Sequence, residues 1–404
     1  MSSARAVLVT LAILMIGFGL LTSLIGVRGT EAFGAGVMGI AGSVHYAGFL
    51  AGALVIPRLL SSVGHIRVYG AIASAAAVIV LVFPFAVNAP TWISIRLALG
   101  LCLSGMYIVA ESWLNSVATN ETRGRLLAVY LVIVNLAFGA GQYLLSAVGA
   151  AGALPFVIGS AVVSLSVIPL SLTTAPAPGL PARSDWPPVR EVIRVAPLGV
   201  ATSIVSGLGV GVAVGMGPTF GVESGLDVNQ IATMMAVAMI GGVMLQWPIG
   251  AWSDRAPRRK VILSISSLAS AAALIGLVFE PGTWGSYAAL GLFTALSFPL
   301  YSLAISHVND VIDPEMRVSA SGVMTMAYGL GSVAGPGVAG AVFDFAGPGA
   351  YWVMMSASTA VLTPYVIYRF IRRPVLANRG GFRPLPPEPS PDPNLLWDEA
   401  NPGL

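Results

Sequence analysis

The feature that most constrains this fold is a series of apolar runs, each about as long as a bilayer is thick. Hydrophobic residues make up 56% of the 404 residues, charged residues only 9%, and the mean hydropathy is +0.85. Soluble domains carry charges on about a quarter of their residues, so this chain has too few to cover a water-exposed surface. Because the runs are long and do not alternate, they predict an integral membrane protein made of α-helices.

Twelve runs reach the roughly twenty residues that a membrane-spanning helix needs. They are 6–27, 36–56, 68–88, 91–114, 125–148, 153–172, 196–217, 229–251, 261–279, 285–307, 318–342 and 350–370. The first run is too long for a signal-peptide core and is not followed by a soluble domain, so we expect it to be retained as a span.

The domain boundaries follow from the one long connection. Residues 173–195 are rich in proline and charge, which is typical of a linker. We expect a six-helix half at 1–172, a cytoplasmic linker at 173–195 and a second six-helix half at 196–370. The proline-rich tail, 371–404, has too few clustered apolar residues for a core, so we expect it to be disordered.

The basic residues predict the orientation. An even number of spans places both termini on one side, and that side receives most of the arginines, whereas the opposite side receives Arg28. Cytoplasmic loops carry an excess of Lys and Arg, so we predict a bacterial inner-membrane protein with both termini in the cytoplasm. The basic residues form no separate domain, so the net charge of +3 does not indicate a nucleic-acid partner.

The two halves repeat in sequence. Asn115, Glu121 and Arg123 follow the fourth span, and Asn309, Glu315 and Arg317 follow the tenth, each pair separated by 194 residues. Ser61 and Asp254, like Arg67 and Lys260, are separated by 193 residues. A six-helix unit used twice is the architecture of a transporter whose halves alternate access to a central site.

A charged loop, GAWSDRAPRRK at residues 250–260, lies between two apolar runs. We expect a gating latch on the cytoplasmic side, because Asp254 is an acid inside a basic loop and orientation alone requires no acid. The alternative is charge that only sets topology. The predicted gating residues are Gly250, Asp254, Arg255, Arg258 and Arg259, with Gly64 and Arg67 in the equivalent loop. That loop has Ser61 in place of the acid.

Ionisable groups inside the spans are candidates for coupling. Arg96 lies a few residues inside the fourth span, Glu111 near the other end of the same span, and His45 near the middle of the second. Intramembrane charges are costly and by default functional. Arg123 and Arg125 are expected ion partners of Glu111. The alternatives are snorkelling of Arg96, a structural salt bridge at Glu111, and a neutral His45 bonded to a neighbouring helix.

Other polar and aromatic residues within spans are expected to line a cavity, although each alone is more often a contact between helices. They are Asn135, Gln142, Gln246, Trp247 and Tyr301. Pro248, Pro299 and Pro336 lie inside predicted helices and should kink them. No nucleotide-binding loop, metal-ligand spacing or catalytic triad is recognisable, so we expect neither an enzyme nor a cofactor.

Seven short segments are distributed over both halves: GIAGS (39–43), RLALG (96–100), ESW (111–113), RGRLLA (123–128), GQ (141–142), LQWPIG (245–250) and GSVAGP (331–336). Together they resemble the YcaD-like group of the major facilitator superfamily. The resemblance implies a secondary transporter of a small solute, coupled to protons, and links Arg96 to that coupling. We expect a small-molecule substrate, protons and the bilayer as partners, and a monomer. Proton-coupled efflux or exchange, uptake of a neutral solute, and a non-transporting receptor or assembly factor remain open.

Overall fold

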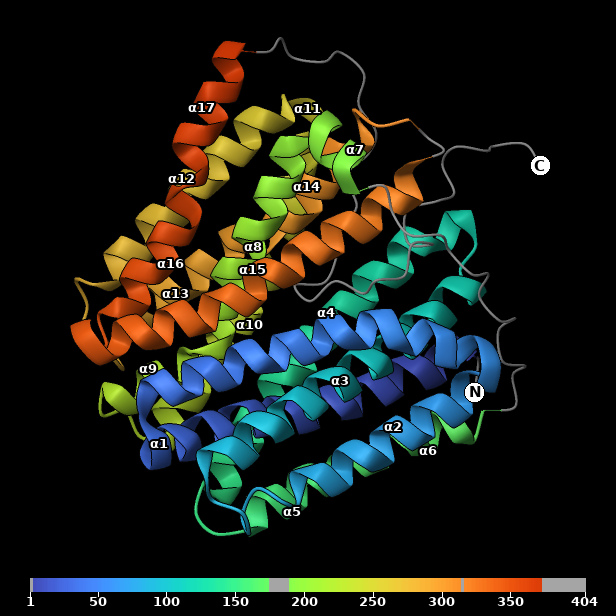
Figure 1. Ribbon diagram of the computed structural model, residues 1–404, viewed down its shortest axis with the longest axis vertical. Helices are drawn as coiled ribbons and strands as arrows, with labels where there is room; N and C mark the ends of the chain where they lie inside the picture. Colours follow the sequence, from blue (N-terminus) through green and yellow to red (C-terminus); the bar gives the residue numbers. More distant parts are fainter. Residues whose placement is uncertain (1–2, 174–188, 314–315, 373–404) are drawn as a thin grey trace.

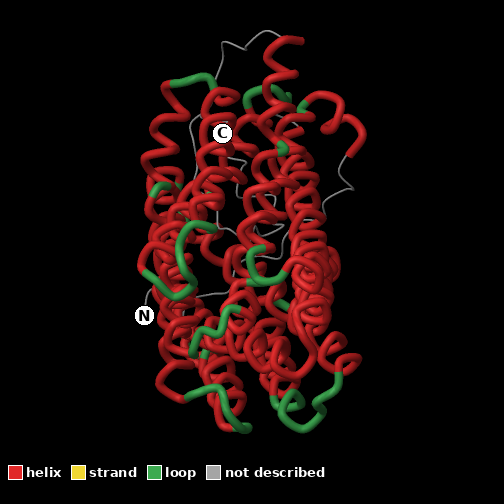
Figure 2. The backbone as a smooth tube through the Cα atoms, turned by 90° about the vertical axis from the view of Figure 1, so that its left-hand side faces the viewer, coloured by secondary structure: helices red, strands yellow, loops and turns green. Residues whose placement is uncertain are grey.

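A computed structural model describes residues 3–173, 189–313 and 316–372, and within these ranges every regular element is a helix (Figures 1 and 2). The first half contains α1 (Ser3–Val63), α2 (His65–Val80), α3 (Ala89–Val117), α4 (Asn120–Val148), α5 (Leu154–Leu165) and α6 (Val167–Ser171). The second half contains α7 (Val189–Val195), α8 (Pro197–Gly215), α9 (Gly217–Glu223), α10 (Val228–Met244), α11 (Gln246–Arg255), α12 (Arg258–Gly276), α13 (Trp284–Ser297), α14 (Pro299–Asn309), α15 (Arg317–Ala346), α16 (Ala350–Ala360) and α17 (Leu362–Arg372).

Ten helical segments of the described chain are long and apolar enough to cross a membrane. One of them, Ala4–Val63, is two arms joined at Gly34, whose φ of 80° breaks the helix. We call residues 3–33 and 35–63 the first and second arms of α1. The twelve predicted ranges lie on helices, five of them on two successive helices, but the third is too short to be among the ten, because α2 ends at Val80 rather than at residue 88. The predicted linker contains α7, and residues 174–188 and the tail from residue 373 lie outside the described chain.

Prolines explain most of the interruptions within spans. Pro248 and Pro299 were predicted to kink their helices, and the helices break at Leu245 and Phe298. A proline lacks the N–H for an intrahelical bond, and its ring clashes with the preceding turn. By contrast, α15 continues through Pro336 without a break. The Pro336 ring instead packs against glycines of neighbouring helices, where no side chain competes for the space.

The bundle has two ends that the loops distinguish. Six of the seven glycines with positive φ in the described chain lie in turns at one end, which we call the Gly34 end: Gly34, Gly149, Gly152, Gly225, Gly282 and Gly347. Such backbone favours glycine because a side chain would clash with its own carbonyl group. The opposite end, which we call the basic end, carries the loops of residues 64, 118–119 and 256–257.

The sequence repeat is matched by a repeat in packing. In the first half, α1 and α4 touch where Gly19 faces the carbonyl of Phe138 and Gly141 faces that of Ile16. In the second half, α8 and α15 touch where Gly207 faces the carbonyl of Tyr328 and Gly331 faces that of Ile204. A Cβ atom at any of these four glycines would overlap the facing carbonyl. The two halves are therefore pseudo-symmetric, held by the same close helix contacts that membrane helices use.

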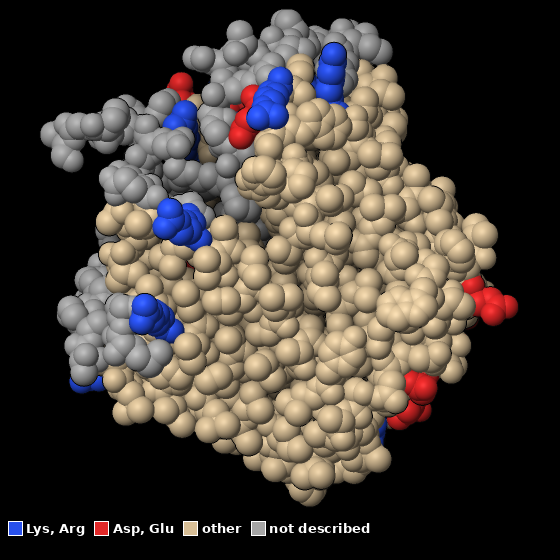
Figure 3. All heavy atoms as spheres, turned by 180° about the vertical axis from the view of Figure 1, so that it is seen from behind, with Lys and Arg blue, Asp and Glu red and all other residues tan. Residues whose placement is uncertain are grey.

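The surface agrees with a protein that spans a membrane. Figure 3 shows a broad face with few charged atoms, which lie toward the two ends. Large apolar side chains are exposed on the outside of the bundle, among them Val78, Leu136, Leu268 and Val353. In water such a surface would be unfavourable, whereas hydrocarbon solvates it without cost. The chain is a multi-pass membrane protein.

Candidate functional site

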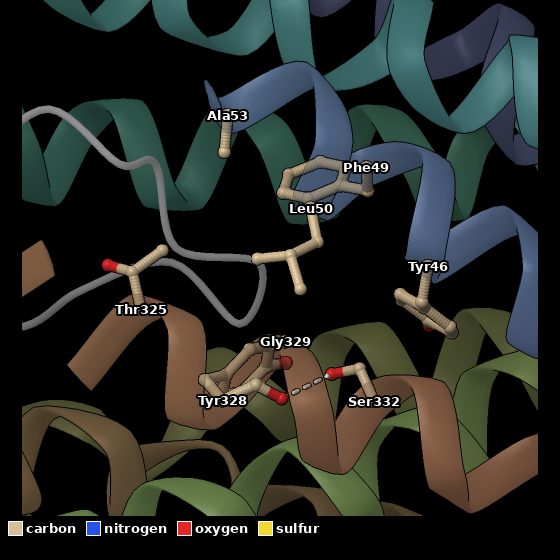
Figure 4. A pocket seen from close by; sticks show the side chains of 8 residues that line it. All are labelled: Tyr46, Phe49, Leu50, Ala53, Thr325, Tyr328, Gly329 and Ser332. Atoms are coloured by element: carbon tan, nitrogen blue, oxygen red, sulfur yellow. Dashed lines mark hydrogen bonds between the residues drawn. The ribbon is translucent and has the colours of Figure 1, made fainter. Parts of the chain in front are cut away.

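A pocket lies between the halves, where the second arm of α1 faces α15 (Figure 4). Its space, counted with the part open to solvent, is about 320 Å³. The side chains lining it are Tyr46, Phe49, Leu50 and Ala53 from α1, and Thr325, Tyr328, Gly329 and Ser332 from α15. Both sets have the spacing i, i+3, i+4, i+7, which is one face of an α-helix. Matching faces of the two halves therefore form the walls.

Hydrogen bonds join the two halves at the Gly34 end. The buried hydroxyls of Thr30 and Thr219 are 3.0 Å apart, and Ser146 donates to the side chain of Asn229. The carboxylate of Asp344 accepts from the backbone N–H of Gly36 at 3.1 Å. Gly36 lies in the first turn of the second arm, so the carboxylate also faces the positive end of a helix dipole. These bonds tie α1 to α9 and α15, and α4 to α10.

Close backbone contact reinforces this end. A Cβ atom on Gly39 would lie 2.5 Å from the carbonyl oxygen of Pro336 and 2.8 Å from the Cα atom of Gly340. Toward the basic end the contact becomes looser: at Gly329 a Cβ atom would meet only the flexible side chain of Leu50, at 3.0 Å. Figure 1 shows α15 and the second arm of α1 diverging toward the basic end. The halves are thus joined on the Gly34 side of the pocket.

The predicted gating loop is organised around Arg258, which is buried. Its Nε donates to Asp310 at 2.6 Å and its Nη1 donates to Ser253 at 2.7 Å, whereas Asp254 lies 3.8 Å away with its side chain 43% exposed. Gly250 and Arg259 are buried, and Arg255 is exposed. The tightest ion pair is therefore Arg258 with Asp310, which joins α12 to the end of α14 inside the second half. The sequence analysis centred on Asp254 and missed this pair, because Asp310 lies 52 residues after Arg258 in the sequence.

The equivalent first-half loop departs from this arrangement. Gly64 takes a φ of 91° before α2, and Arg67 is exposed. His65 stands 193 residues before Arg258 and is buried, with its Nε2 3.1 Å from the hydroxyl of Ser112. A histidine in the place of the arginine, and Ser61 in the place of the aspartate, make the two loops chemically different.

The candidate coupling residues are buried. Glu111 is 1% exposed and accepts a hydrogen bond from the hydroxyl of Tyr130. His45 has its Nδ1 3.2 Å from the backbone carbonyl of Arg96, so it joins α1 to α3. Arg96 is 8% exposed, which places its side chain inside the bundle. Arg125 is exposed, and of Arg123 the structure describes only the backbone, in α4.

None of the five side chains predicted to line a cavity lines the described pocket. Tyr301 comes nearest: its hydroxyl is 3.2 Å from that of Thr325, and its ring packs edge-on against Tyr328 at 5.1 Å. Gln142 accepts from Ser23, linking α1 and α4, and Asn135 donates to Leu131 of its own helix. Gln246 is buried, and Trp247 is 80% exposed. No group of three potential metal ligands occurs in residues 3–173, 189–313 and 316–372.

The cross-half bond of Asp344 gives a prediction. Replacing Asp344 with alanine removes a carboxylate from a helix N-terminus, an exposed interaction worth about 0.3–1 kcal/mol. We expect the Gly34 end to open about twofold to fivefold more often. The measurement is the rate at which a maleimide labels Thr219→Cys, buried at this end, in protein whose Cys102 is replaced by alanine.

A matched control is Asp227→Ala. Asp227 is also an acid capping a helix at the Gly34 end, but it accepts from Gln230 within its own half. Its loss should leave the labelling rate of Thr219→Cys unchanged. Equal acceleration by both variants would contradict a specific role for Asp344 in joining the halves.

Comparisons with known proteins agree with this architecture. The family model of the Major Facilitator Superfamily matches residues 199–398. The uncharacterised MFS-type transporter YcaD of Escherichia fergusonii is 28% identical over 74% of this chain and 78% of its own length. A similarly named transporter of Yersinia enterocolitica is 26% identical over the same shares.

Solved structures share the fold. The nucleoside transporter NupG superposes with a TM-score of 0.77 at 14% identity, covering 92% of this chain and 99% of its own. A bacterial homologue of the lysosomal transporter Spinster, described as inward-facing and unoccupied, gives 0.64 at 15% identity over 91% and 95%. The solved structures share the helical fold built from two halves. The family-model match and the similarity to YcaD support a transporter of the major facilitator superfamily, of the YcaD-like group.

Proposed function

We propose that this protein is a secondary transporter that carries a small organic solute by alternating access. The observation that carries the proposal is the position of the cross-half bonds: Thr30–Thr219 and Gly36–Asp344 lie at one end, with the pocket between the halves on their other side. A transporter that works by alternating access needs its two halves to be joined at one end while the other end admits the solute. Opening the Gly34 end and joining the basic end would complete the cycle.

The proposal places the basic end in the cytoplasm of a bacterial inner membrane. Arg5, Arg58 and Arg67 lie at this end, as do Arg255 and Lys260, and cytoplasmic loops carry such an excess. The structure then corresponds to an inward-facing state.

We also propose that proton movement is coupled to transport through Glu111. Its carboxyl group is buried and accepts from Tyr130. A buried carboxyl group changes charge at a cost that depends on its neighbours, so a rearrangement of the helices around it can change its protonation. Proton-coupled efflux or exchange would result.

The test of coupling uses Glu111→Gln. A ligand-stabilisation screen of the purified protein first supplies a transported compound. In liposomes, the variant should keep exchange of that compound at equal pH but lose at least about tenfold of its accumulation driven by a pH gradient, because glutamine cannot carry the proton. Transport by the unmodified protein that ignores the gradient would favour facilitated movement of a neutral solute. No flux of any stabilising compound would favour a receptor.

The gating loop gives a further prediction. The side chain of Asp254 is 43% exposed, and surface ion pairs contribute little to stability, so Asp254→Asn should leave thermal stability nearly unchanged. If the acid belongs to a latch that joins the basic end, the same variant should slow transport several-fold. Ser61→Ala, at the equivalent place in the first half, should do neither, since Ser61 donates only to Arg58 of its own helix. Normal transport by Asp254→Asn would leave the loop with only a role in topology.

A further inference from the structure

The pocket between the halves has an unusual combination of walls. Three of its eight lining residues are aromatic, Tyr46, Phe49 and Tyr328, and none of the eight carries a charge. The surface exposed to the pocket is apolar, because the hydroxyl of Ser332 donates to backbone carbonyls of Gly207 and Tyr328 and that of Thr325 bonds to Tyr301. Figure 4 shows the Leu50 side chain reaching from α1 toward Gly329 on α15, with the Phe49 ring beside it along α1.

The aromatic walls are held in place from behind. The ring of Phe49 packs edge-on against Tyr107 of α3 at 6.2 Å, and the ring of Tyr328 packs edge-on against Tyr301 of α14 at 5.1 Å. Tyr107 and Tyr301 are 194 residues apart, the spacing of the repeat in this region. Each wall is therefore supported by the equivalent helix of its own half, so the faces of both rings are fixed before any solute enters.

This chemistry restricts what can bind. A charged solute entering here would lose its hydration without gaining an opposite charge from the lining side chains, which is strongly unfavourable. A flat ring gains contact with aromatic faces and edges on both walls.

We propose that the transported solute is an uncharged compound with a flat aromatic ring, bound between the apolar walls that Phe49 of α1 and Tyr328 of α15 help to form. This inference rests on the proposed transport function and names its substrate class. It excludes sugar phosphates, amino acids and other solutes that are charged at neutral pH from this pocket.

The test compares probes that share one ring and differ in charge. Binding to the purified protein in detergent is measured as the rise in apparent unfolding temperature with concentration. 2-Naphthalenemethanol should stabilise the protein, whereas 2-naphthoate and the 2-naphthylmethylammonium ion should bind at least about tenfold more weakly, a difference of roughly 1.4 kcal/mol. Cyclohexanemethanol, which lacks the flat ring, should also bind weakly.

Variants assign the binding to this pocket. Phe49→Ala and Tyr328→Ala should each weaken 2-naphthalenemethanol about tenfold, because each removes one wall. Gly329→Leu should fill the pocket and abolish binding; the atoms nearest to its Cβ would belong to the flexible side chain of Leu50, and the unfolding temperature without probe shows whether the fold is kept. Trp247→Ala, an exposed aromatic outside the pocket, should bind like the unmodified protein.

The inference is overturned if the charged probes bind as well as the neutral one, if 2-naphthalenemethanol gives no stabilisation, or if Gly329→Leu keeps full binding. Its failure is separable from failure of the proposed function, because binding in detergent requires no transport. If the two halves alternate in access but the protein does not bind the neutral probe, the proposed transport function stands and the proposed substrate class is wrong.

Discussion

Gly39→Leu should trap the protein with its Gly34 end open and stop transport. Even the first carbon of a side chain at this position would lie 2.5 Å from the Pro336 carbonyl oxygen and 2.8 Å from the Gly340 Cα. Both are backbone atoms of α15, which no change of rotamer can move. Overpacking of this kind costs about 1–3 kcal/mol, and separation of the halves relieves it. The open population should therefore rise about fivefold to 150-fold.

Maleimide labelling of Thr219→Cys, in protein lacking Cys102, measures this opening, because Thr219 is buried against Thr30 at the Gly34 end. The matched control is Gly139→Ala, which also lies between the halves. There a Cβ atom would approach Ala236 no closer than 3.8 Å, an ordinary contact. The control should label at the unmodified rate. Unchanged labelling in Gly39→Leu, in a folded protein, would show that the Gly34 end does not open by parting these helices.

Arg258→Met should produce the largest loss of stability. The arginine is 2% and Asp310 6% exposed at their side chains, and their atoms are 2.6 Å apart. Removing one partner of a buried ion pair typically costs about 3–5 kcal/mol, because the remaining charge stays out of water. The free energy of unfolding in detergent should fall by about that amount.

Two further variants separate the ion pair from general loss of charge. Arg258→Met combined with Asp310→Leu should recover most of the loss, since no buried charge is left behind. Asp254→Asn touches the same arginine at 3.8 Å from a half-exposed site and should cost at most about 1 kcal/mol. Equal losses from Asp254→Asn and Arg258→Met would mean that Asp310 is not the main partner.

The sequence predicted the fold well because membrane spans depend on few variables. Length and apolarity identify each run, and the fixed spacing between Arg123 and Arg317 indicates the repeated unit. Helix ends were predicted less well where prolines act: the helices break next to Pro248 and Pro299, whereas α15 continues through Pro336, whose ring packs against glycines of other helices.

The site was predicted less well than the fold. The spacing of Tyr46, Phe49, Leu50 and Ala53 was visible, and so was the same spacing from Thr325 to Ser332. Such stripes occur on most packed helices, so neither stripe indicates that it faces the other across the two halves. The partnership of Arg258 with Asp310 likewise depends on where α14 ends relative to α12. Asn135 and Gln142 were chosen as cavity residues because they are polar. In the structure Gln142 instead links α4 to α1, and Asn135 bonds to the backbone of its own helix.

Alternating access is tested most directly by distances measured at both ends of the same protein. Spin labels at Phe85 and Trp284, both strongly exposed, report on the Gly34 end, and labels at Ser62 and Lys260, also exposed, report on the basic end. Introducing Gly39→Leu should lengthen the Gly34-end distance and shorten the basic-end distance. Distances that lengthen together, or a basic end that does not respond, would contradict the account.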